Sequence, residues 1–194
     1  MTEHEAIAHS QPRREALIQA GYTLLAQRGF EGLRTRDVSA AVGVNIATLH
    51  YYFPTKEALI AGILEHTMAR FRTTIAPGES RGDLLRAHFR GLRRLVHDEP
   101  EIFTVMGELA LRSSRDEGIA DLFGKTIETW HRTMRTLIES ASRDGSLSVQ
   151  GDPDAQASLV VSAVMGACIV PMNRSARLED TFCALEGALG MRQQ

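Results

Sequence analysis

The stretch VSAAVGVNIATLHYYF, residues 38–53, decides the fold of this chain. Apolar residues at helical spacing lead up to Gly43, and a second short helix can begin after Asn45. Leu49 and Phe53 lie four residues apart, on one face of that second helix. Two short helices joined by a tight turn around a glycine predict a helix-turn-helix.

The segments around this pair complete a three-helix head. An apolar stripe at helical spacing begins near Pro12, a residue tolerated in a first helical turn. Gly29 is the predicted end of that helix. Thr35 is a candidate cap for the second helix, which runs to Val42, and Asn45 is the candidate cap for the third.

Beyond the head the chain shows helical spacing and no credible strand pattern. A long amphipathic segment leads away from the head and is broken at Pro77-Gly78, a predicted domain boundary. The predicted fold class is therefore all-α, with an N-terminal three-helix helix-turn-helix head and a C-terminal helical body. The predicted divisions are a disordered arm over residues 1–11, the head over 12–56, a connecting helix over 57–76 and the body over 77–194.

Charge is unevenly distributed along the chain. The formal net charge is −2, whereas DNA-binding proteins usually show a basic footprint. Between Ser10 and Lys56, however, six basic residues face three acidic ones. The head is therefore mildly basic and the rest of the chain is net acidic, and this local distribution matters more than the average.

Several classes of protein are disfavoured by motif and composition. Cys168 and Cys183 exclude a disulfide framework and fit a reducing cytosol, so we expect a cytoplasmic protein with inert thiols. The N-terminus lacks the apolar core of a signal peptide. Residues 155–173 carry no charge, but their many small residues favour a buried or interface helix over a membrane span. With no metal-ligand spacing and no nucleophile motif, we expect no metal, no cofactor and no enzyme, although an active site assembled from distant residues stays open.

The second helix of the pair has an unusual predicted surface. Its start carries small or hydrogen-bonding side chains, and its end carries the aromatic run His50-Tyr51-Tyr52. This pattern suits a helix inserted end-first into the major groove of DNA. Tyr hydroxyls and imidazole can bind phosphate, and Lys56 lies in the first turn of the next helix, where ammonium and amide groups can meet one phosphate. The alternative, a helix pair without a ligand, explains the aromatic run less well.

A continuous set of residues between Arg13 and Leu64 has a recognisable pattern, and this pattern resembles the TetR family of transcriptional regulators. Two positions depart from the family, namely His50, where tyrosine is common, and Arg34, where Ser or Thr is common. The remaining helices resemble the family only in length and arrangement. The residues that carry the resemblance are Gly29-Phe30, Arg36-Asp37-Val38, Ala41, Gly43-Val44, Thr48-Leu49, Tyr52-Phe53 and Lys56-Glu57-Ala58-Leu59.

The resemblance implies that the head is a DNA-binding domain for a double-stranded operator. Few long side chains face the bases, so we expect specificity from thymine methyl contacts and DNA shape. Which of Tyr51 and Tyr52 contacts phosphate stays open. The implied contacts are Thr35 and Arg36 near the backbone, Asn45, Ile46, Ala47 and Thr48 at base edges, and His50, Tyr51, Tyr52 and Lys56 at phosphates. Arg34, which departs from the family, is expected to reach a phosphate itself.

For the body, the resemblance implies ligand sensing and formation of a homodimer through the last two helices. The helix over residues 155–169 is apolar nearly all round and must be covered on every side. A central helix of a monomer is the alternative. The expected interface residues are Ala157, Val160, Val161, Val164, Cys168, Phe182, Leu185 and Leu189.

Methionine and aromatic residues of the body are candidates to line a pocket for a small-molecule effector, although plain core explains them equally well. We therefore predict a repressor that leaves a pseudo-palindromic operator when a small, largely apolar molecule binds its body. The alternatives are a constitutive dimeric DNA-binding protein with no ligand, or an all-α enzyme. The expected pocket residues are Phe89, Leu92, Phe103, Met106, Trp130, Met134, Met165 and Met172.

Overall fold

The computed structural model describes residues 3–74, 80–148, 151–169 and 177–191 of the chain, with side chains described from residue 11 onward. These residues form nine helices and no strand, which confirms the all-α class. The helices are α1 (Glu3–Gly32), α2 (Thr35–Val42), α3 (Ile46–Tyr52), α4 (Lys56–Arg72), α5 (Arg81–Asp98), α6 (Glu101–Ser113), α7 (Glu117–Arg143), α8 (Pro153–Ala167) and α9 (Arg177–Ala188).

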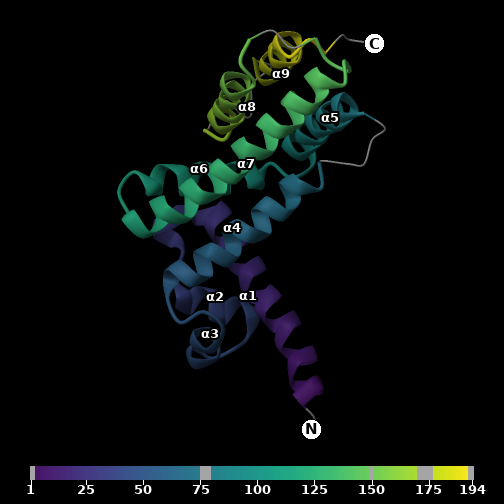
Figure 1. The fold of residues 1–194 in the computed structure, drawn as a ribbon. Helices are drawn as coiled ribbons and strands as arrows, with labels where there is room; N and C mark the ends of the chain where they lie inside the picture. The colour runs from purple at the N-terminus through teal and green to yellow at the C-terminus, as the bar shows by residue number, and fades with distance from the viewer. Residues whose placement is uncertain (1–2, 75–79, 149–150, 170–176, 192–194) are drawn as a thin grey trace.

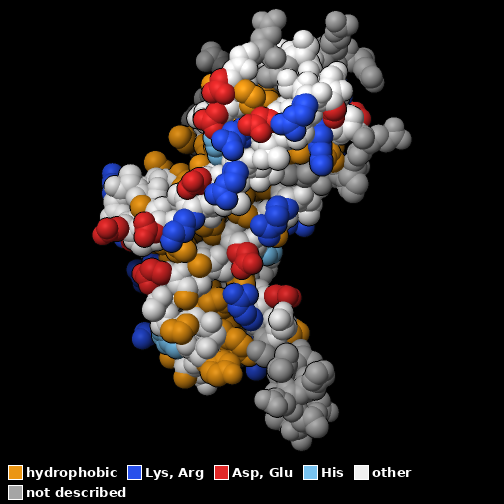
Figure 2. Space-filling view, in the orientation of Figure 1, with side chains coloured by type: hydrophobic (Ala, Val, Ile, Leu, Met, Phe, Trp, Pro, Cys, Tyr) orange, Lys and Arg blue, Asp and Glu red, His pale blue; other side chains and the backbone are white. Residues whose placement is uncertain are grey.

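The molecule is elongated, with the head at one end and the body at the other (Figure 1). Helices α1, α2 and α3 form the head, and α4 rises from it into the body, where it contacts α6 and α7. Helix α1 also reaches the body, because it packs against α6. On the face drawn in Figure 2, charged side chains of both signs spread over the body, whereas hydrophobic side chains show at the end of the head where α3 lies.

The start of α1 differs from the prediction. The helix begins at Glu3 rather than near Pro12, and the proline lies inside it, so the segment expected to be a disordered arm is helical from Glu3. Good helix formers, mainly Ala and Glu, precede the proline and continue the helix although Pro donates no backbone hydrogen bond. The division of the chain into domains stays a prediction.

The turns of the head follow local chemistry. Gly29 and Gly43 adopt positive φ angles of 67° and 71°, which glycine reaches without a steric penalty. Gly43 ends α2, as predicted, whereas the helix end predicted at Gly29 is a kink inside α1, which continues to Gly32. The Asn45 side chain accepts a hydrogen bond from the Thr48 amide at 2.7 Å, so the predicted cap of α3 is confirmed. The cap expected from Thr35 is wrong, because Arg34 occupies that position and makes no side-chain cap bond.

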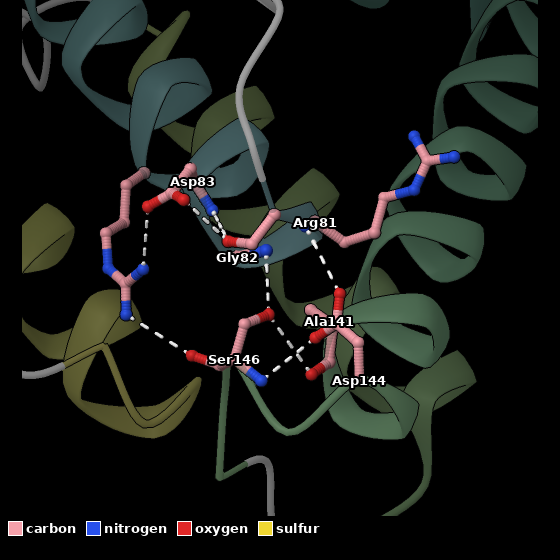
Figure 3. Close-up of polar contacts among 8 residues, drawn as sticks. Arg81, Gly82, Asp83, Ala141, Asp144 and Ser146 are labelled. Carbon is pink, nitrogen blue, oxygen red and sulfur yellow. Dashed lines mark hydrogen bonds and ion pairs between the residues drawn. The ribbon is translucent and has the colours of Figure 1, made fainter.

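The first turn of α5 is hydrogen-bonded to the turn after α7 (Figure 3). The Gly82 amide donates to Ser146 Oγ at 3.0 Å, and the Ser146 amide donates to Asp144 Oδ1 at 2.9 Å. A Cβ on residue 82 would lie 2.8 Å from Ser146 Oγ, so only glycine allows this approach without a shift. The Ser146 hydrogen bonds lower the pKa of the Asp144 carboxyl. This connection closes the body at the end away from the head.

Helix α8 is a body helix in the structure. Its Val160 and Val164 are buried, whereas Leu159 keeps 46% of its surface exposed. Among the described residues, no helix is both long enough and apolar enough to cross a membrane.

Candidate nucleic-acid interface and body cavity

Helix α3 is anchored by two buried residues and presents the rest of its surface to solvent. Leu49 is fully buried and Phe53 is 1% exposed, so both belong to the core as predicted. The face away from this core carries the residues expected to contact DNA bases and phosphates. Asn45, Ile46, Ala47 and His50 are exposed, and Thr48 is half-buried.

The cap of α3 constrains two of these residues. Asn45 Oδ1 accepts both the Thr48 amide at 2.7 Å and the Thr48 hydroxyl at 2.9 Å. The oxygen of Asn45 and the hydroxyl proton of Thr48 are therefore engaged within the helix start, and the Asn45 amino group remains as a donor. Contact of these side chains with bases stays a prediction.

The two neighbouring tyrosines occupy different environments. Tyr51 is 78% exposed, whereas Tyr52 is half-buried and packs against the hydrophobic core. Their rings meet edge-to-face with centroids 5.1 Å apart. Tyr51 is thus the freer hydroxyl for a backbone phosphate, and the Tyr52 ring supports it from the core side.

Arginines flank the turn between α1 and α2. Arg34 and Arg36 are exposed and form no ion pair among the residues that the structure describes, while Thr35 is half-buried. Arg28 differs from them, because it lies 3.7 Å from Asp37. The Arg34 and Arg36 guanidinium groups lie at the start of α2, the helix that packs against α3, and without an ion pair among the described residues they leave positive charge available for phosphates.

Lys56 lies at the base of the head and faces an aromatic ring. Its Nζ is 4.3 Å from the centroid of the Phe30 ring, and Arg112 of α6 covers the same ring with its Cζ 4.6 Å from the centroid. Burial lowers the pKa of Lys56, opposed by the nearby Glu31 carboxylate. The sequence predicts a phosphate contact here, and in the structure this side chain also links the head to the body.

We define the head–body junction as Gly29, Phe30, Lys56, Glu108 and Arg112. The Phe30 amide donates to Glu108 Oε2 at 2.8 Å. A Cβ on residue 29 would lie 3.0 Å from that oxygen, so the glycine brings the two segments together. Sequence reasoning missed this junction, because nothing in the pattern of α6 links it to a turn of the head.

A cavity of about 360 Å³ lies in the body between α4, α5 and α7. This volume is within the range of small-molecule sites. Apolar side chains form most of its wall, and Glu65, Arg72 and Lys125 bring charges to it. The lining residues are Ala61, Leu64, Glu65, Met68, Phe71, Arg72, His88, Leu122, Lys125, Thr126, Thr129, Trp130 and Thr133.

Of the residues expected to line a pocket, Trp130 lines this cavity. Met165 is half-buried on α8, and Met172 lies outside the described residues. The others do not line the cavity, because helix packing buries their side chains in the core. Helix α4, which the sequence predicted only as a connection, forms part of the wall. These core residues are Phe89, Leu92, Phe103, Met106 and Met134.

Two buried polar groups in the cavity wall lack partners among the residues that the structure describes. His88 is 1% exposed, and its Nδ1 pairs with the Thr74 hydroxyl. Among the described residues, no group pairs with His88 Nε2 or with Trp130 Nε1. Burial lowers the pKa of His88 to about 4, so the imidazole is neutral near pH 7. Neither His97, which is exposed, nor His131, which pairs with Ser158 at 3.0 Å, lines this cavity.

The residues expected at the dimer interface are buried within the single chain. The apolar spacing of these helices therefore identified residues of the core and not of an exposed surface. The exposed positions of α8 are Asp154, Ala155, Ser158, Leu159 and Ser162, and Ile169 just beyond it is 50% exposed. Burial raises the pKa of the Cys168 thiol to about 12, which leaves it inert. The residues concerned are Ala157, Val160, Val161, Val164, Cys168, Phe182, Leu185 and Leu189.

Comparisons with known proteins point to one family. Residues 17–63 match the model of the bacterial regulatory proteins of the tetR family. The chain is 26% identical over 151 residues to the tetracycline repressor protein class D of Escherichia coli, covering 70% of this chain and 69% of that protein. It is 25% identical over 201 residues to the HTH-type transcriptional repressor NemR of Escherichia coli strain K12, covering 97% and 92%.

Solved structures agree with these sequence matches. A TetR-family transcriptional regulator from Rhodococcus sp. superposes with a TM-score of 0.79 at 28% identity, covering 93% of this chain and 98% of that one. The reduced form of NemR from E. coli superposes with a TM-score of 0.77 at 22% identity, covering 93% and 100%, and shows the shared fold. Within the described part of the chain, no group of three or more His, Cys, Asp or Glu residues is arranged to hold a metal ion.

Proposed function

This chain is a TetR-family transcriptional regulator that binds DNA, and we propose that it is a repressor released from its operator by a small, largely apolar molecule. The relatives at 25–26% identity are named repressors. The observation that carries the ligand step is the cavity of about 360 Å³ whose wall includes α4. We further propose that it acts in the cytoplasm, where a bacterial operator lies.

The proposed DNA contacts centre on α3. Ile46 and Ala47 offer exposed apolar surface for thymine methyl groups, and Tyr51 and His50 offer donors to phosphates. Arg34 and Arg36 supply exposed positive charge beside the helix. The small side chains at the helix start permit close approach of the backbone to the base edges.

We propose that two copies pair through the exposed faces of α8 and α9. Leu159 and Ile169 are large apolar residues that remain about half exposed, at 46% and 50%. Ala184, Gly187 and Ala188 of α9 are small and exposed, which favours close helix approach. A two-fold dimer would place its heads on half-sites about 34–36 Å apart, and this matches a pseudo-palindromic operator.

Helix α4 is the proposed mechanical link between ligand and DNA. Its first residue, Lys56, lies at the head–body junction, while its Leu64, Met68 and Phe71 line the cavity. A ligand that binds better to one position of α4 shifts the heads toward that position. Coupling of this kind typically amounts to about 1–3 kcal/mol.

The decisive experiment is selection of bound DNA from a random pool, followed by affinity measurements over a range of salt concentrations. We expect an inverted repeat and a steep fall of affinity with salt, because each phosphate contact contributes a slope of about 0.9. Arg36→Ala should reduce the magnitude of that slope by about 0.9, the contribution of one phosphate contact. Arg132→Ala, an exposed arginine on α7, is the matched control and should leave it unchanged. A slope insensitive to Arg36 would overturn the proposed interface.

A further inference from the structure

The starting point is the tautomer of His88. The Thr74 hydroxyl donates its single proton to the Phe71 carbonyl at 2.6 Å. It can therefore only accept from His88, so the Nδ1 of His88 carries the ring proton. In a neutral imidazole the other nitrogen is then a bare acceptor. His88 Nε2 is such an acceptor, in a side chain that is 1% exposed and lines the cavity.

Trp130 supplies the complementary group. Its indole Nε1–H is a donor only, the side chain is 7% exposed, and the ring lines the same cavity. The His88 and Trp130 rings meet in a T-shaped arrangement with centroids 6.3 Å apart. The two rings in contact thus carry one acceptor and one donor without a partner among the described residues, and each nitrogen is costly to bury in this state.

The other residues of the cavity wall restrict the polarity and charge of the rest of the ligand. Leu64, Met68, Phe71 and Leu122 surround the space with apolar surface. The threonines of α7 add no free donor, since the Thr126 hydroxyl already donates to the Leu122 carbonyl at 2.9 Å. The charged side chains of the lining, Glu65, Arg72 and Lys125, are exposed, so charge is confined to the outer rim.

From this arrangement we propose that the effector is an uncharged, mainly apolar molecule with a hydroxyl group, whose proton goes to His88 Nε2 and whose oxygen accepts from Trp130 Nε1–H. A hydroxyl is a single group that donates and accepts at once. A ketone or ether leaves Nε2 without a donor. A carboxylate has no proton for it, and an ammonium group cannot accept from the indole. The inference rests on the proposed ligand function of the cavity.

The test uses a matched series of non-fluorescent probes: 4-tert-butylcyclohexanol, its methyl ether, 4-tert-butylcyclohexanone, tert-butylcyclohexane and 4-tert-butylcyclohexanecarboxylate. Trp130 is the only tryptophan of the chain, so its emission reports on the cavity directly. Calorimetry gives the same affinities independently. We expect the alcohol to bind at least about tenfold more tightly than the ketone, the ether and the hydrocarbon, because only the alcohol satisfies both nitrogens.

Two variants assign the effect to the named atoms. His88→Phe and Trp130→Phe each keep an aromatic ring but remove one polar partner, so the preference for alcohol over ketone or hydrocarbon should collapse in calorimetry. Thr126→Val is the control in the same wall and should retain the preference, because its hydroxyl is already engaged. Circular dichroism and thermal melting check that each variant folds.

Several outcomes would overturn the proposal. Equal binding of alcohol and hydrocarbon would mean that a water already satisfies the two nitrogens. Tighter binding of the carboxylate, or a preference that survives both Phe variants, would also reject it, as would failure of every probe to bind. The proposed function has a separate readout. If the alcohol binds with the expected preference but leaves operator affinity unchanged, release by ligand fails while the hydroxyl site stands.

Discussion

The head and the cavity of this protein are built from contacts of very different range. In the head, the cap of α3 joins residues three apart, Asn45 and Thr48, and the turn depends on Gly43 alone. In the cavity, residues far apart along the chain, such as Ala61 of α4 and Thr133 of α7, line the same space. The polar groups at the start of α3 point to water or to near neighbours, whereas His88 and Trp130 bury nitrogens that lack partners among the described residues. The start of α3 thus satisfies its polar groups locally, whereas the cavity wall leaves two nitrogens for a ligand.

The two regions meet at the head–body junction. Phe30 lies in the last turn of α1, just after the kink at Gly29. Its amide donates to the Glu108 carboxylate of the body, and Arg112 covers its ring. A movement of the body can therefore act on the head at this point as well as through α4. The comparison predicts that changes in each region have separable effects, and that the two regions are connected through the junction and through α4.

The largest effect is expected from the core of the head. Leu49→Ala removes a fully buried side chain and should destabilise the head by about 2–5 kcal/mol, because it leaves a cavity beneath α3. Chemical unfolding followed by circular dichroism measures the loss, and operator binding should disappear with it. The Trp130 emission should keep its native wavelength until higher denaturant. A single transition shared by both probes would show that the two regions do not separate.

Lowering the pH should destabilise the body through protonation of His88. Its pKa is lowered from 6.5 to about 4, so the unfolded chain binds more protons between these values. The stability contributed by the neutral imidazole is present above pH 6.5 and is lost as the pH falls toward 4, by up to about 3 kcal/mol. Unfolding by urea from pH 7 to 4 measures this. In His88→Phe the slope over this window should shrink.

Other acidic groups respond in a different window, which separates them from His88. The pKa of Asp83 is lowered by its hydrogen bond with Ser80, and that of Asp144 by Ser146. Their contributions are present above the ordinary aspartate pKa of 3.8 and decline below it. A pH dependence in His88→Phe that is as steep as before between 6.5 and 4 would contradict the assignment.

The junction should give an intermediate effect. Glu108→Ala leaves the Phe30 amide without its partner and should cost about 1–3 kcal/mol of stability. Because head and body are then less firmly connected, a bound effector should lower operator affinity less than in the unaltered chain. Glu108→Gln, which retains an acceptor oxygen, is the matched control. Loss of coupling in both variants would point to the charge rather than to the hydrogen bond.

The smallest effect is expected at the surface of α3. Tyr51→Phe removes one exposed hydroxyl and should weaken operator binding by about fivefold, the value of one hydrogen bond, with stability within about 0.5 kcal/mol of the unaltered chain. Tyr52→Phe is the matched comparison, since its ring packs against the core. Gel-shift titration of both variants measures the difference. A larger loss in Tyr52→Phe would reverse the roles assigned to the two tyrosines.

The predictions from sequence succeeded where the physics is local. The all-α class, the helix-turn-helix and the end of α2 at Gly43 follow from spacing and from the conformational freedom of glycine. The cap at Asn45 follows from a side chain that accepts the amide proton three residues on. The start of α1 was placed too late, because the proline was read as a beginning although the helix continues through it.

The sequence by itself therefore determined the helices, their turns and the exposed surface of α3, since all of these depend on residues within one or two helical turns of each other. Only the tertiary structure decided that α4 walls the cavity, that His88 presents a bare nitrogen beside Trp130, and that Lys56 covers Phe30. It also decided that Val160 and Leu185 are core within one chain. Periodicity marks which residues are buried, but the partner of a buried face comes from helices dozens of residues away, and their packing has no local signature.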